Sequence, residues 1–158
     1  MSNDDKIISD LKSFTKLIRK KILEMALSAG ASSSHFGGAL SIVEIVSVLF
    51  HYQMNLKKKN DKNWQHRDRF ILSKGHACLA YYAALNAKGY ISDQELESFE
   101  KDNSDLAGHP VKNLNLGIDF SNGSLGMGLS IGMGQAIASN LKKIENKIYV
   151  ILGDGECN

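Results

Sequence analysis

The spacing of hydrophobic and polar residues predicts an amphipathic helix at the start of the chain. Apolar side chains recur every three or four positions between residues 4 and 29, which places them on one face of a helix. Gly30 follows the last of them and is expected to end the helix. The apolar positions are Ile7, Leu11, Phe14, Ile18, Ile22, Met25 and Ala29.

A run of small residues from 30 to 41 predicts a loop with His35 near its middle. Ser41 followed by Glu44 has the pattern of a capping box, so a second helix is expected from Ile42 to about Phe50. An isolated loop histidine most simply bonds a neighbouring carbonyl. The glycine and serine backbone donors around His35 favour a functional role for it.

Two short apolar runs, Arg69–Ser73 and Ile148–Leu152, predict β-strands. The second run is uninterrupted and β-rich, which is typical of a parallel strand buried on both faces of a sheet. Lys74-Gly75-His76 follows the first strand and opens a helix that should end near Lys88. A helix N-terminus beside His76 would favour a neutral imidazole or a bound anion.

The second strand stops at Gly153-Asp154-Gly155, which places one carboxylate at its carboxyl end. Ligands of open α/β sheets bind at that edge. An acidic side chain between glycines suits a divalent ion that bridges to a diphosphate, because glycines allow the phosphate to approach the backbone.

A further capping box, Ser92 with Glu95, predicts a short helix to about Glu100. The loop after it contains His109, which Pro110 biases toward an extended backbone. Three of the five histidines therefore lie beside small residues in loops or turns, and the other two are interpreted as surface or packing residues. The three are His35, His76 and His109; the two are His51 and His66.

Residues 117–136 are rich in glycine, but their pattern does not fit a dinucleotide fingerprint. Gly126 and Gly128 begin G-x-G-x-x-G, and Ile131 stands where the third glycine should be. A helix over 124–144 with a small face fits better, and another helix or a flat cofactor could approach that face closely. Each glycine inside the helix costs roughly 1 kcal/mol against alanine, which close packing must offset. The small face consists of Gly128, Gly132, Ala136 and Asn140.

Composition excludes several classes of function. The chain has 158 residues, 43% of them hydrophobic and 23% charged, and its net charge of +2 gives no reason to expect a nucleic-acid partner. Its two cysteines are too few for a disulfide framework, and its N-terminus is too polar for a secretory signal. The uncharged stretch 120–141 carries too many polar residues to span a membrane. We therefore expect a soluble, cytoplasmic protein.

Five ordered motifs together resemble the N-terminal, diphosphate-binding domain of transketolases, from about Lys16 to Asn158. They are similar above all to the split transketolases, in which this domain and the pyrimidine-binding part are separate polypeptides. The resemblance implies an α/β fold with helices around a parallel sheet. It also implies a transferase of carbohydrate and pentose phosphate metabolism that moves a two-carbon ketol unit from a ketose phosphate to an aldose. The motifs are SSSHFGG, HRDRFILSKGHA, LAGHP, SNGSLGMGLS and VILGDGE.

The same resemblance implies a thiamine diphosphate site and the residues that form it. Asp154 is implied as a ligand of the Mg²⁺ or Ca²⁺ ion that holds the diphosphate, with Gly153 and Gly155 beside it and the Gly155 N–H donating to the diphosphate. The loop that lines the aminopyrimidine is implied to contain Gly123, Ser124 and Leu125.

The three loop histidines have implied roles as well. His76 would contact the diphosphate near the reacting carbon, while His35 and His109 would bond the sugar hydroxyls and move protons. An imidazole titrates at about pH 6.5, so it can both give and take a proton at neutral pH.

The chain departs from the family at several points. Ser34-His35-Phe36-Gly37 stands where the family usually has Gly-His-Pro-Gly, and Ser124 stands where many members have proline. The family's activating glutamate and the asparagine that completes the metal shell are expected beyond these motifs. With Asp154 as the only clear metal-binding carboxylate and only two strands, residues 1–158 are expected to be the N-terminal part of a larger domain. This part should be inactive alone.

The expected partners are the C-terminal pyrimidine-binding part or subunit, in a dimer or heterotetramer, and sugar phosphates. Two other functions stay open at this point. One is a different thiamine diphosphate enzyme, such as a deoxyxylulose-phosphate synthase or a dehydrogenase E1 subunit. The other is a non-catalytic remnant that only binds a partner chain.

Overall fold

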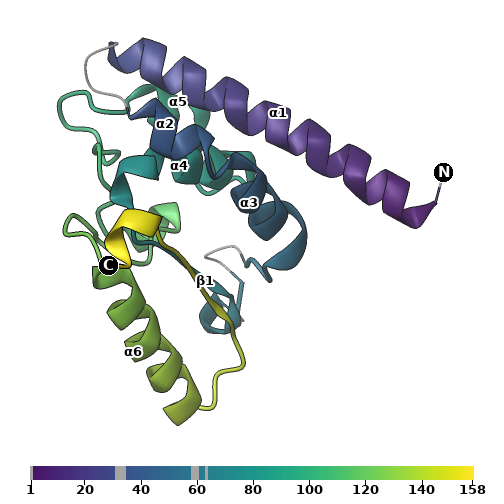
Figure 1. Cartoon of the computed structure of the whole chain (residues 1–158), viewed down its shortest axis with the longest axis vertical. Helices are drawn as coiled ribbons and strands as arrows, with labels where there is room; N and C mark the ends of the chain where they lie inside the picture. Colours follow the sequence, from purple (N-terminus) through teal and green to yellow (C-terminus); the bar gives the residue numbers. More distant parts are fainter. Residues whose placement is uncertain (1, 31–34, 58–60, 63) are drawn as a thin grey trace.

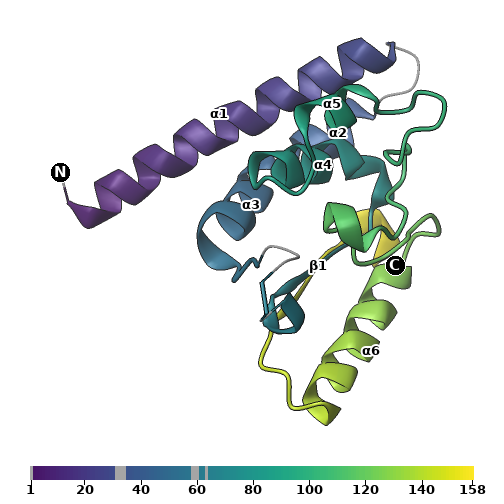
Figure 2. The ribbon, with the colours of Figure 1, turned by 180° about the vertical axis from the view of Figure 1, so that it is seen from behind.

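The computed structural model describes residues 2–30, 35–57, 61–62 and 64–158, and it shows an α/β arrangement of helices around a parallel pair of strands (Figure 1). Helices α1 to α5 lie on one side of the strands and α6 on the other (Figures 1 and 2). The expected α/β fold with helices around a parallel sheet is confirmed, and the sheet has two strands in the described part of the chain. The α-helices are α1 (Asn3–Ala29), α2 (Phe36–Leu40), α3 (Val43–Val48), α4 (Cys78–Ala87), α5 (Asp93–Glu97) and α6 (Met127–Leu141); the strands are β1 (Arg69–Leu72) and β2 (Ile148–Ile151). Single turns of other helix types are η1 (Leu49–Gln53), η2 (Trp64–His66), η3 (Gly75–Ala77), η4 (Leu114–Leu116) and η5 (Asp154–Glu156).

The core lies between α1, α3 and α4. Helix α4 is buried almost all round, from Cys78 to Asn86, and α1 covers it with an apolar stripe. The amphipathic helix predicted at the start of the chain is confirmed, with Gly30 at its C-cap. The N-terminal turns of α1 extend beyond the rest of the molecule (Figure 1). The buried residues of the stripe are Phe14, Ile18, Ile22, Met25 and Ala26.

The strands pair in parallel, with Arg69 opposite Ile148 and Leu72 opposite Ile151. Side chains of β1 alternate: Phe70 belongs to the core on the α4 side, whereas Ile71 faces α6. Helix α6 approaches the strands closely because Gly128 and Gly132 face them.

Two expectations about this region are wrong. Strand β2 is not buried on both faces, because within the described part of the chain it pairs with β1 alone and Ile148 to Val150 are half-buried. The small face of α6 is shorter than predicted: Gly128 and Gly132 are buried against the strands, while Ala136 and Asn140 are exposed. The close neighbour of the glycines is therefore the sheet, not another helix or a cofactor.

The loop predicted from 30 to 41 is partly helical. Residues 31–34 lie outside the described residues, but α2 begins directly after His35. The capping box predicted at Ser41 is absent: the Ser41 hydroxyl donates to the Gly38 carbonyl, and Glu44 pairs with Arg19 at 2.6 Å. The box at Ser92 is confirmed, with both of its hydrogen bonds present.

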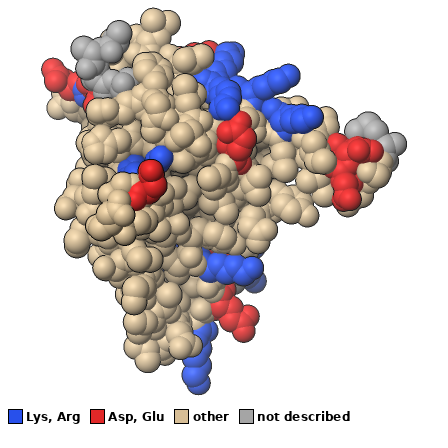
Figure 3. All heavy atoms as spheres, viewed as in Figure 1, with Lys and Arg blue, Asp and Glu red and all other residues tan. Residues whose placement is uncertain are grey.

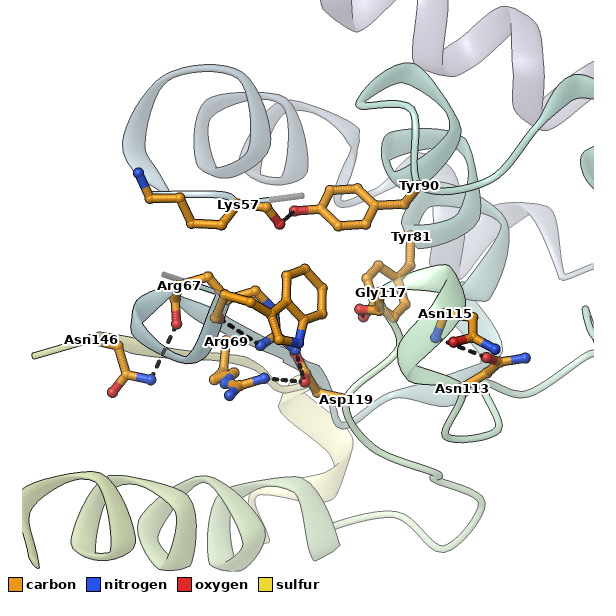
Figure 4. A network of polar contacts seen from close by, with 11 residues as sticks. Lys57, Arg67, Arg69, Tyr81, Tyr90, Asn113, Asn115, Gly117, Asp119 and Asn146 are labelled. Atoms are coloured by element: carbon orange, nitrogen blue, oxygen red, sulfur yellow. Dashed lines mark hydrogen bonds and ion pairs between the residues drawn. The ribbon is translucent and has the colours of Figure 1, made fainter. Parts of the chain in front are cut away.

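A charged network fastens the loop before α6 to the start of β1 (Figure 4). Asp119 accepts hydrogen bonds from Arg67 and, at 2.6 Å, from Arg69. Arg67 and Asp119 are only 2% and 8% exposed, and the guanidinium carbon of Arg67 lies 3.6 Å from the ring centroid of Trp64. The hydroxyl of Tyr81 donates to the Gly117 carbonyl two residues before Asp119.

Helix α6 presents apolar side chains to solvent. In Figure 3 the surface over α6 is almost free of charge along its length. Within the described ranges no helix combines the length and apolarity needed to cross a bilayer. An exposed apolar patch on a globular protein typically marks a surface that another element or chain covers. The exposed residues are Leu125, Met127, Leu129, Met133, Ile137 and Leu141.

Replacing Asp119 with alanine should destabilise the fold strongly. Arg67 would be left buried without its charge partner, which typically costs about 3–5 kcal/mol. Urea denaturation of D119A measures the loss in the free energy of unfolding. Asp105, which is exposed, provides the control: D105A should unfold at the wild-type urea concentration. A D119A midpoint equal to that of D105A would contradict the role given to the network.

Two glycines of α6 should respond to alanine with opposite signs. A Cβ at Gly128 would overlap the Ser73 side chain and come within 2.8 Å of the Ser73 Cα, so G128A should lose about 1–3 kcal/mol of stability by overpacking. A Cβ at Gly134 would meet nothing within 4 Å, so G134A should gain up to about 1 kcal/mol from helix propensity. Stabilisation by both variants in thermal or urea unfolding would show that α6 is not held close to the strands.

Candidate functional site

The two turns that follow β1 and β2 lie side by side. The Ser73 N–H donates to the Ile151 carbonyl at 2.9 Å, so the strands end at the same level. The stem of Lys74 comes within 3.6 Å of the position that a Cβ on Gly153 would occupy. The Lys74 ammonium donates to the Ser41 hydroxyl at 3.3 Å, which places a cation between the two turns and the end of α2.

The structure brings the three predicted histidines together at this edge. The ring centroids of His35 and His76 are 4.9 Å apart, and those of His76 and His109 are 4.6 Å apart, both edge-on. His35 is exposed at the N-cap of α2, and His76 is half-buried in the η3 turn. His51, by contrast, packs with its ring tilted against that of Phe14, at 4.7 Å between ring centroids, as expected for a packing residue.

Two side chains of α4 hydrogen-bond to the backbone of the loop that carries His109. The Tyr82 hydroxyl donates to the Ala107 carbonyl at 2.8 Å, and the Cys78 thiol donates to the Gly108 carbonyl at 3.1 Å. Burial raises the pKa of Cys78 to about 12, so it stays a neutral thiol at physiological pH. These bonds hold His109 over His76 without using the imidazole itself.

The imidazole of His109 should be mostly neutral at pH 7. Burial lowers its pKa, the nearby imidazoles of His76 and His35 lower it further, and Glu100 offsets part of the effect. A neutral ring has one nitrogen that accepts and one that donates a hydrogen bond. His109 can therefore accept a proton from a hydroxyl at this edge.

The residues expected to bind the diphosphate and its metal are at the same edge. Asp154 and Gly155 are exposed in the η5 turn directly after β2, and Gly153 is half-buried. Asp154 therefore points out of the core. Among the described residues, no group of three His, Cys, Asp or Glu side chains is arranged to hold a metal ion.

The loop expected to line the aminopyrimidine precedes α6. Gly123, Ser124 and Leu125 are all exposed. A Cβ at Gly123 or at Gly155 would meet nothing within 4 Å, so both glycines border open space. That space is where a flat or anionic ligand could approach the backbone.

Two further residues at this edge were not among those predicted from the sequence. Asn122 donates from its side-chain amide to the Leu72 carbonyl, and its Oδ1 is buried without a partner in the described part of the chain. Glu156 accepts from the Ser73 hydroxyl at 2.6 Å and from two backbone amides. The position of Glu156 directly after Gly-Asp-Gly was the available signal, because a carboxylate there can reach both neighbouring turns.

Comparison with known proteins identifies the family. Residues 12–158 match the family model described as "Transketolase, thiamine diphosphate binding domain". The chain belongs to the transketolase family.

Several transketolase subunits are similar to it. The chain is 40% identical over 147 residues to the 6-deoxy-6-sulfo-D-fructose transketolase subunit of Clostridium sp. (strain MSTE9), covering 93% of this chain and 52% of that subunit. It is 39% identical over 138 residues to one subunit of the apulose-4-phosphate transketolase of Phocaeicola vulgatus, covering 87% of this chain and 48% of that subunit. The chain thus spans about half the length of these curated relatives.

Solved transketolases have the same fold over this region. The transketolase from Leishmania mexicana superposes with a TM-score of 0.82 at 28% identity, covering 93% of this chain and 23% of that one. The transketolase from Campylobacter jejuni gives a TM-score of 0.79 at 29% identity, covering 93% and 24%. The resemblance inferred from the motifs is confirmed as to family and fold.

The pKa of His109 provides a test of the imidazole cluster. Proton NMR titration of the ring should give a midpoint below the ordinary histidine value of about 6.5. The variant H76N removes a neighbouring imidazole that lowers the pKa of His109, so it should raise that midpoint toward the ordinary value. H51N, which changes a histidine outside the cluster, should leave it unchanged. An unshifted His109 midpoint in H76N would show that the two rings are not neighbours in solution.

Proposed function

We propose that this chain is the diphosphate-binding part of a transketolase that transfers a two-carbon ketol unit from a ketose phosphate to an aldose. The observation that carries the proposal is the meeting of three imidazoles and an exposed carboxylate at one edge, where β1 and β2 end together. The relatives named as transketolase subunits support the reaction class.

The residues present fit thiamine diphosphate and a divalent cation. Open space over Gly123 and Gly155 leaves room for a ligand against the backbone, and Asp154 offers the hard oxygen that Mg²⁺ or Ca²⁺ prefers. In the proposal Asp154 holds the cation and the Gly155 N–H donates to the diphosphate. When bound, the cofactor supplies the carbanion chemistry of ketol transfer.

The histidines carry out the acid–base and binding roles of the proposal. His76, the central ring of the three, contacts the diphosphate, and Leu125 makes an apolar contact with the aminopyrimidine. His35 and His109 bind the sugar hydroxyls, and His109 accepts a proton because burial and the adjacent imidazoles keep it neutral.

A second polypeptide or chain segment is part of the proposal. Asp154 alone cannot fill the coordination shell of a divalent ion, which takes about six oxygen ligands. Strand β2 also has an unpaired edge in the described region, and the apolar surface of α6 is uncovered. We infer a pyrimidine-binding transketolase subunit as the partner, in a dimer or heterotetramer acting on sugar phosphates in the cytoplasm.

Cofactor titration with and without a partner tests this function. Thiamine diphosphate and Mg²⁺ should bind weakly to the chain alone and tightly once the pyrimidine-binding subunit of a split transketolase is added, as measured by calorimetry. D154A should weaken binding in the complex by about tenfold or more, because it removes a charged metal ligand. D105A serves as the control and should bind as the wild type does.

Two results would contradict the proposal. If the wild-type complex does not bind the cofactor, the proposed function is wrong. Tight binding by the chain alone would show that the site needs no second part.

A further inference from the structure

The carboxylate of Glu156 joins the two strand ends to the start of α6. Its Oε2 accepts from the Ser73 hydroxyl at 2.6 Å and from the Gly126 N–H at 2.7 Å. Its Oε1 accepts from the Gly153 N–H at 2.7 Å. One side chain therefore binds the residue after β1, the residue before α6 and the first residue of the Gly-Asp-Gly turn.

Ser73 extends this connection into α6. Its hydroxyl oxygen accepts from the Gly128 N–H at 3.1 Å while the hydroxyl donates to Glu156. Helix α6 has no side-chain cap on its N-cap residue, Gly126, whose φ of 81° suits glycine. Ser73 and Glu156 together thus satisfy N–H groups at the start of α6 that a capping side chain would otherwise bind.

We propose that Glu156 is a positioning residue that holds the loop 123–126 and the turn 153–155 in fixed relation to each other. This inference rests on the proposed function, since those two segments contain the residues assigned to the aminopyrimidine and to the diphosphate. All three hydrogen bonds that Glu156 accepts come from protein groups. Its carboxylate therefore acts on the site by positioning Gly126 and Gly153. Ligand contacts are left to their neighbours, Leu125 and Asp154.

The variant E156Q tests the proposal with little change in volume. A glutamine has one acceptor oxygen and a donor NH₂ group, so it cannot accept from Gly126 and Gly153 at opposite ends at once. At least one of these amides should lose its partner. E145Q is the matched control, because Glu145 is exposed and makes no side-chain hydrogen bond or ion pair in the described part of the chain.

Hydrogen exchange of the 158-residue chain without cofactor, followed by NMR, is the first measurement. In E156Q the amide of Gly126 or Gly153 should exchange about tenfold faster or more, while core amides of α4 such as that of Tyr82 keep their protection. S73A, which removes the acceptor of the Gly128 amide and keeps the carboxylate, should accelerate exchange at Gly128 and affect Gly126 and Gly153 less than E156Q does. Unchanged exchange at both Gly126 and Gly153, or an equal loss of protection in α4, would overturn the proposal.

Cofactor affinity in the complex with the pyrimidine-binding subunit is the second measurement. E156Q should raise the dissociation constant of thiamine diphosphate about tenfold while changing turnover at saturating cofactor less, as expected of a residue that positions and does not react. An unchanged dissociation constant would overturn the positioning role. If the wild-type complex binds no cofactor, the proposed function fails, and the exchange data still decide whether Glu156 holds the two segments.

Discussion

The parallel pairing of β1 and β2 is the constraint on which the rest of the structure depends. The two strands are far apart in the chain, yet they begin opposite each other at Arg69 and Ile148 and so end together. Because both point the same way, the turns that follow them emerge at one edge. The stem of Lys74 on one turn thereby comes within 3.6 Å of the position that a Cβ on Gly153 would occupy on the other.

Helix α6 packs closely on the paired strands because it presents glycines to their side chains. Gly132 lies so close that a Cβ there would come within 2.5 Å of Val150. The same helix begins where Glu156 and Ser73 bind its first amides, so the packing that covers the strands also places the loop 123–126 beside the turn after β2. The packing over the strands and the geometry of the proposed site therefore both depend on the contact between α6 and the strands.

The charged network and the cluster of histidines lie at opposite ends of the strands. The buried ion pairs of Asp119 with Arg67 and Arg69 are at the start of β1, and the cluster of imidazoles is at its end. In the charged network both arginines point toward one carboxylate (Figure 4). The proposed ligand-binding edge instead leaves Asp154 and Gly155 exposed, which is what a ligand-binding edge of an α/β sheet requires.

Local patterns in the sequence determined most of the elements and the candidate residues. The stripe of α1, the strand β1, the capping box at Ser92 and the position of Asp154 after β2 all follow from interactions between residues close together in the chain. Tertiary structure decided the remainder, because contacts between distant segments override local preference. Glu44 bonds Arg19 in place of capping a helix, the glycines of α6 meet the strands, and Glu156 binds segments 30 and 83 residues away. Sequence could name the three histidines, but only the docking of α2 on the η3 turn and the hydrogen bonds from α4 to the loop of His109 brought the rings of His35 and His109 within 5 Å of that of His76.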